Sequence, residues 1–93
     1  MAATITTIAQ LINACPVTVS TAEGVTQAIT WFDTVVVFCE KSTVIEIPTK
    51  TDIAVRAQSF ADATEIGSTD YGPLNNKLMH IKLMLGGVQA VID

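Results

Sequence analysis

Three side chains of this sequence are natural candidates for nucleophilic or acid–base chemistry: Cys15, Cys39 and His80. His80 is the single histidine, and it has no aspartate at ligand spacing; Asp93 is the nearest acid downstream of it. A histidine that acts as a general base would need the fold to bring a nucleophile to it. We therefore predict that His80 lies at the surface or is loosely packed, on the polar side of a helix.

Cys15 and Cys39 lie 24 positions apart and form no Cys-x-x-Cys pair. This spacing indicates neither a zinc ribbon nor a thioredoxin-like redox site. Cys39 follows the apolar run 35–38 and is interpreted as a small buried apolar residue. A disulfide between the two cysteines would need an oxidising compartment, so we expect reduced, structural thiols.

The nine acidic residues are scattered along the chain and match neither a glycosidase pair nor a calcium-binding loop. Asp62 and Glu65, three positions apart on a predicted helix, are interpreted as part of a solvated face. Gly86 and Gly87 are not followed by the Lys or Ser of a phosphate-binding loop. The sequence therefore predicts no catalytic residue, no metal site and no cofactor, and we do not expect an enzyme. An enzyme that uses Cys39 or His80 is the weakest alternative.

The composition restricts the class of protein. The chain has 93 residues, of which 49% are apolar and only 15% are charged, against about 25% charged residues in an average soluble domain. This length fits one domain, 1–93, and the apolar content excludes a disordered tail. The net charge of −4 and the five basic residues, which form no patch, argue against a nucleic-acid partner.

No export or membrane signal is predicted. The first 22 residues carry no charged side chain, and no Lys or Arg precedes Lys41, whereas a secretory signal needs a basic start. A spanning helix needs about 20 mostly apolar residues, and this stretch is interrupted by Gln10, Asn13 and Pro16. We expect a soluble protein that is made in the cytoplasm without a signal peptide and has no membrane partner.

The first half of the chain predicts two helices and a β-hairpin. Residues 4–14 have a helical apolar face, and Ser20 with Glu23 has the spacing of a capping box for a helix that follows. Residues 34–39, TVVVFC, are almost continuously β-branched or aromatic and predict a buried strand. Residues 43–47 alternate in part, and Pro48 ends this second predicted strand.

The second half predicts two further helices. One begins at a Thr49 or Thr51 cap and buries a stripe at 3.6-residue spacing, formed by Ile53, Ala57, Phe60, Ala61 and Thr64. After a loop at 67–72, Pro73 begins a helix whose stripe is Leu74, Leu78, Ile81 and Leu85. Gly86 is the expected helix cap, and residues 88–92 are a closing strand.

A hairpin competes with this last helix, because residues 79–85 and 88–92 also alternate around the possible turn Gly86–Gly87. The predicted fold class is α+β: a small single domain with several short helices around a β-hairpin. The alternative is a mostly β fold with a C-terminal hairpin.

Four apolar side chains are candidate interface residues: Tyr71, Met79, Leu83 and Met84. Leu83 and Met84 cannot join the Leu74–Leu85 stripe of a helix, because sequence neighbours are about 100° apart. With so few charges, we expect apolar surface that meets a partner.

The predicted function is a structural subunit of a large homomeric assembly, most specifically a virion component such as a capsid decoration, connector or tail protein. Its partners would be copies of itself and other structural proteins, with no small-molecule substrate. The alternative is a small cytosolic homodimeric binding or regulatory module.

Overall fold

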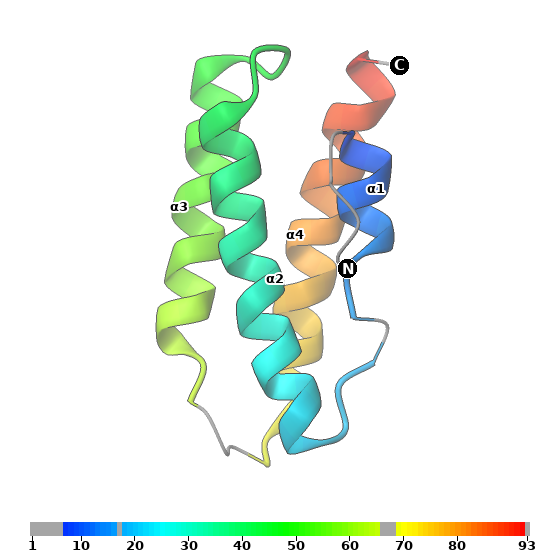
Figure 1. Cartoon of the computed structure of the whole chain (residues 1–93), viewed down its shortest axis with the longest axis vertical. Coiled ribbons are helices and arrows are strands. Elements are labelled where there is room, and N and C mark those ends of the chain that lie inside the picture. Colours follow the sequence, from blue (N-terminus) through cyan, green and yellow to red (C-terminus); the bar gives the residue numbers. More distant parts are fainter. Residues whose placement is uncertain (1–6, 17, 66–68, 93) are drawn as a thin grey trace.

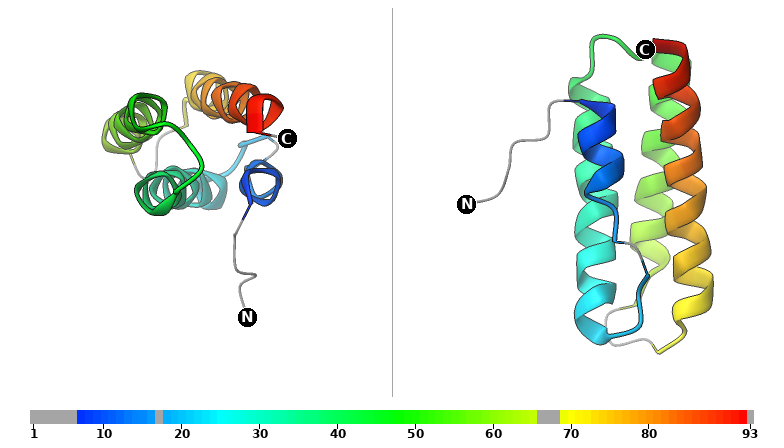
Figure 2. Two further views of the ribbon diagram at one scale, coloured as in Figure 1. Left: turned by 90° about the horizontal axis from the view of Figure 1, so that it is seen from above. Right: turned by 90° about the vertical axis from the view of Figure 1, so that its right-hand side faces the viewer.

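The computed structural model describes residues 7–16, 18–65 and 69–92, and these residues form four α-helices. They are α1 (Ile8–Asn13), α2 (Ala22–Lys41), α3 (Ile47–Ala63) and α4 (Tyr71–Ile92). Successive helices run in opposite directions (Figure 1). Seen from above, they occupy the corners of a bundle in which α2 and α4 lie diagonally opposite (Figure 2). The predicted α+β class is wrong, because the described part of the chain contains no strand.

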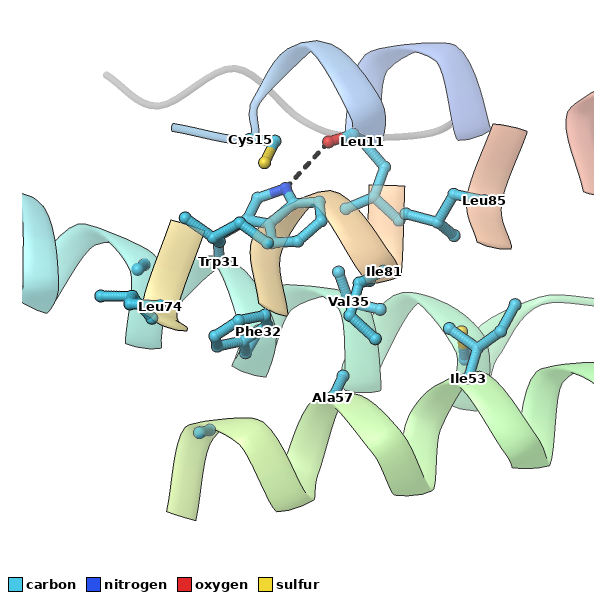
Figure 3. Close-up of a cluster of buried hydrophobic side chains, with 14 of the residues drawn as sticks. Leu11, Cys15, Trp31, Phe32, Val35, Ile53, Ala57, Leu74, Ile81 and Leu85 are labelled. Carbon is cyan, nitrogen blue, oxygen red and sulfur yellow. Dashed lines mark hydrogen bonds between the residues drawn. The ribbon is translucent and has the colours of Figure 1, made fainter. Parts of the chain in front are cut away.

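Apolar stripes on the three long helices build the core (Figure 3). α2 contributes Val25, Ala28, Phe32, Val35 and Cys39. The stripe predicted for α3 is confirmed for Ile53, Ala57 and Ala61, while Phe60 and Thr64 are half-buried. The stripe predicted for α4 is confirmed in full: Leu74, Leu78, Ile81 and Leu85 are each at most 5% exposed.

Threonine side chains begin the first two helices. Thr7 Oγ1 accepts a hydrogen bond from the Gln10 backbone N–H at 3.2 Å, and the Gln10 side chain accepts one from the Thr7 N–H at the same distance. This capping box was not predicted. For α2 the cap is Thr21, whose Oγ1 accepts from the Gly24 N–H at 3.1 Å, so the predicted Ser20 cap is wrong by one residue.

Trp31 joins α2 to α1. At the end of α1 the Cys15 N–H donates to the Ile12 carbonyl at 3.1 Å, instead of to the Leu11 carbonyl four residues before it. The indole Nε1 of Trp31 donates to this Leu11 oxygen at 2.9 Å in a buried contact (Figure 3). The carbonyl that the helix end leaves without a helical partner is thereby satisfied.

The predicted hairpin at 34–47 is wrong, because residues 34–39 lie in the second half of α2. Their β-branched side chains favour strands only weakly, and tertiary packing overrides such preferences. In the helix, Val35 and Cys39 continue the buried stripe that begins at Val25, and Val37 points outward with 46% exposure. Pro48 does not end a strand; it lies in the first turn of α3, where its missing N–H costs nothing.

The predicted closing strand at 88–92 and the competing hairpin are also wrong. α4 passes through Gly86 and Gly87 and continues to Ile92, and neither glycine has a left-handed backbone conformation. Burial explains the continuation, because Val88 extends the core stripe and packs against it. Tyr71 and Gly72, expected in a loop, form the first turn of α4. Residues 4–6 of the predicted first helix, with that part of its apolar face, and residues 67–68 of the predicted loop lie outside the described residues.

Candidate functional site

The side of α4 that faces away from the core carries exposed apolar side chains. Met79 is 61% exposed and Leu83 is 70% exposed. They are four residues apart, so they lie one above the other on the helix surface. We call this side the α4 outer face and define it by its exposed residues: Asn76, Met79, Leu83, Gly87 and Ala90.

A pair of hydrogen bonds sets the rotation of α4. The Asn75 Oδ1 atom accepts from the Val19 backbone N–H at 2.7 Å, and Asn75 Nδ2 donates to the Val19 carbonyl at 3.1 Å. The Asn75 side chain therefore bonds both backbone groups of Val19 and holds the segment between α1 and α2 against α4. Because Val19 is only 2% exposed, its backbone groups depend on this side chain. With Asn75 directed inward, the α4 outer face points to solvent.

The structure brings together two of the four predicted interface residues. Met79 and Leu83 share the α4 outer face, whereas Tyr71 and Met84 are half-buried and pack against the core. Met84 is about 100° around the helix from Leu83, and this rotation turns it toward α3. An interface that uses all four residues stays a prediction.

An apolar groove lies where the start of α3 meets the end of α4. It has a volume of about 700 Å³ and is lined by Val44, Ile45, Glu46, Thr49, Ile53, Met84, Gly87 and Val88. Val44, which lines the groove, is 64% exposed, and Ile47, which follows the lining residue Glu46 in the chain, is 71% exposed. The sequence did not indicate this groove, because residues 43–47 were predicted to be a strand. Pro48, which is common in the first turn of a helix, was the available signal.

His80 is exposed, as predicted, and its contact is aromatic. Its ring meets the Phe60 ring edge-on, with centroids 5.8 Å apart and planes at 85°. The Nζ atom of Lys77 lies 6.0 Å from the centroid of the Phe60 ring, which is the distance of a weak cation–π contact. His80 and Lys77 of α4 therefore both pack on the Phe60 ring of α3.

Both thiols are free and buried, and burial was predicted for Cys39. Burial raises the pKa of Cys39 to about 11, although the nearby Lys50 charge acts in the opposite direction. Burial also raises the pKa of Cys15, against the charge of Lys82. Because the thiolate is the reactive form, these two groups are poor nucleophiles at neutral pH. Among the residues that the structure describes, no three His, Cys, Asp or Glu side chains gather to hold a metal ion.

None of the helices in the described ranges is both long enough and apolar enough to cross a membrane. Comparisons with known proteins found no family model, no curated protein and no solved structure that matches the chain.

Proposed function

We propose that the chain is a structural subunit that assembles with copies of itself through the α4 outer face. The observation that carries this proposal is the exposure of Met79 and Leu83, at 61% and 70%, on one side of one helix. Burying such a side chain contributes about 1.5–3 kcal/mol, so the two together supply a useful part of a contact. If this face binds a different surface of the next copy, the contact repeats from copy to copy and gives a large assembly.

For this assembly we propose a virion, in which the chain would be a capsid decoration, connector or tail protein. The support is the composition: a chain of 93 residues with 15% charged and 49% apolar residues, which leaves apolar surface for many contacts between subunits. Electron microscopy of the assembled protein tests this class. Rings, tubes or a lattice support it, and a solution of closed dimers contradicts it.

The self-assembly itself is tested by size-exclusion chromatography with light scattering over a dilution series. We expect the wild-type protein to form particles larger than a dimer. Leu83→Gln should raise the protein concentration needed for assembly by at least about tenfold, since 1.4 kcal/mol is a factor of ten. A wild-type protein that stays monomeric at every concentration would contradict the proposal.

Val55→Gln is the matched control. Val55 is 62% exposed, nearly as much as Leu83, but it lies on α3. It should assemble like the wild type if α4 makes the contact. An equal loss in both variants would mean that assembly depends on general surface hydrophobicity and not on the α4 outer face.

A second candidate is a small homodimeric binding module, and the apolar groove at the end of α3 and α4 favours it. Its volume of about 700 Å³ falls within the range of small-molecule pockets, roughly 300–1,000 Å³. In that case light scattering should give two chains per particle. An apolar fluorescent probe should also bind, and Met84→Lys, which places a charge in the groove, should abolish its binding.

A further inference from the structure

The structure points to the surface that receives the α4 outer face. We propose that α4 of one copy packs on the outward side of α2 of the next copy, in a head-to-tail contact. This inference rests on the proposed function, because it names the partner surface for the same assembly. We define the α2 outer face by its exposed residues Glu23, Thr30, Asp33, Val37 and Glu40.

The charges of the two helices are complementary. Between residues 71 and 92, α4 carries Lys77 and Lys82 and no acidic residue, and Lys82 is exposed beside the α4 outer face. α2 carries three exposed acids, Glu23, Asp33 and Glu40, against one base, Lys41. None of these three acids forms an ion pair with another residue in the described ranges. Opposite charges across an interface select the partner surface and its orientation.

The α2 outer face is also suited to an apolar partner. The Thr30 hydroxyl donates to the Thr26 carbonyl at 3.0 Å, and the Thr34 hydroxyl donates to the Thr30 carbonyl at 2.8 Å. Because these hydroxyls are already hydrogen-bonded within the helix, the methyl group of Thr30 is free to meet an apolar side chain. Val37, 46% exposed, adds apolar surface between Asp33 and Glu40.

The alternative contact of α4 on α4 of a second copy would bring two cationic helices together. Like charges at close range oppose association, so the charges favour α2 as the partner.

Gly86 and Gly87 of α4 are compatible with a close approach by a helix of either kind. A Cβ atom at Gly86 or Gly87 would meet nothing within 4 Å in the chain itself. Packing within the chain therefore does not explain why these two helical positions are glycines.

The position of the two faces decides the type of assembly. α2 and α4 lie at opposite corners of the bundle, so their outward sides point away from each other (Figure 2). A contact between two different surfaces of identical subunits is heterologous and leaves one free surface of each kind after every addition. It therefore produces a ring if the rotation closes and a filament if it does not. The two helices have similar lengths, about 30 and 33 Å at 1.5 Å per residue, so they can pack along their full length.

The test uses two variants that each lose one face. Met79→Gln/Leu83→Gln removes the apolar side chains of the α4 outer face, and Asp33→Asn/Val37→Lys makes the α2 outer face less acidic and less apolar. All four positions are exposed, so both variants should fold, and circular dichroism with thermal unfolding checks this. Each variant alone should be monomeric by light scattering. An equimolar mixture should form a particle of two chains and grow no further, because only one intact face of each kind is present.

Three results would overturn the inference. If Asp33→Asn/Val37→Lys assembles like the wild type, the α4 outer face binds another surface, such as α4 of a second copy. If the folded variants remain monomeric when mixed, α4 and α2 do not meet. If the wild-type protein itself never assembles, the proposed function fails, and this inference fails with it; the first two results leave self-assembly intact.

The salt dependence gives an independent readout. Raising the salt concentration from about 0.05 to 0.5 M should weaken assembly, because salt screens the charges. Assembly that salt leaves unchanged would contradict the charge argument.

Discussion

Replacing Gly86 and Gly87 with alanine tests whether α4 is continuous, the feature in which the structure differs most from the sequence-based expectation. In the structure both glycines lie inside a helix with ordinary helical backbone conformations. If they formed a hairpin turn or a left-handed cap, at least one would need a positive φ, which alanine adopts only at a cost of about 1–2 kcal/mol. The sign of the stability change therefore distinguishes the two structures.

The magnitude follows from helix propensity and from the space around each glycine. Glycine in a helix interior is about 0.8–1 kcal/mol less favourable than alanine. A Cβ atom at either position meets no atom within 4 Å, so no steric cost opposes this gain. The double variant Gly86→Ala/Gly87→Ala should gain about 1.5–2 kcal/mol of unfolding free energy. For a domain of this size, 1 kcal/mol corresponds to a Tm increase of roughly 4–8 °C.

The assay is thermal and urea unfolding followed by circular dichroism, in the Met79→Gln/Leu83→Gln background, so that self-assembly does not contribute to the measured stability. Gly24→Ala is the matched control, since Gly24 is also helical. Its added Cβ would lie 3.2 Å from Val19 Cγ1 and 3.4 Å from Thr21 Oγ1. Val19 is only 2% exposed and has little room to move, so the gain at Gly24 should be smaller or negative. A loss of stability in Gly86→Ala/Gly87→Ala would refute the continuous helix.

Three further predictions concern buried groups. Asn75→Ala should lower the unfolding free energy by about 1–3 kcal/mol in urea titrations, because it leaves the Val19 N–H and carbonyl without their partner. The control Asn76→Ala, at the neighbouring exposed position, should change the unfolding free energy by less than about 0.5 kcal/mol. Equal effects of the two substitutions would mean that the Asn75 hydrogen bonds contribute nothing. Trp31→Phe should cost at least about 1 kcal/mol, since it removes the donor to the buried Leu11 carbonyl, and native Trp31, 4% exposed, should be protected from iodide quenching; strong quenching would contradict its burial. The raised pKa of Cys39, about 11, means that the unfolded chain loses this proton first as pH rises from about 9 to 11. Stability should therefore fall over that interval by at most about 1.4 kcal/mol per pH unit from this thiol, and Cys39→Ala should show a shallower fall; an unchanged slope would exclude this origin.

Local periodicity of the apolar residues is enough to predict part of this fold. Leu74, Leu78, Ile81 and Leu85 repeat at helical spacing, and this repeat correctly predicted both the helix and its buried side. The same reasoning placed Ile53, Ala57 and Ala61 in the core. The α4 repeat also placed Leu83 outside the core, because a helix turns by about 100° per residue and Leu83 therefore cannot lie on the Leu74–Leu85 stripe.

The secondary structure of two segments could not be predicted from the sequence, because their local preferences conflict with their packing in the bundle. The run 34–39 has side chains suited to a strand, yet a helix there buries Val35 and Cys39 in the hydrophobic core. Gly86 and Gly87 resemble a turn, yet the helix continues because Val88 gains burial beyond them. In both segments the local preference is about 1 kcal/mol per residue or less, and burying one large apolar side chain contributes about 1.5–3 kcal/mol. Which apolar surfaces are available for burial depends on distant parts of the chain, and for that reason only the assembled bundle determines these helices.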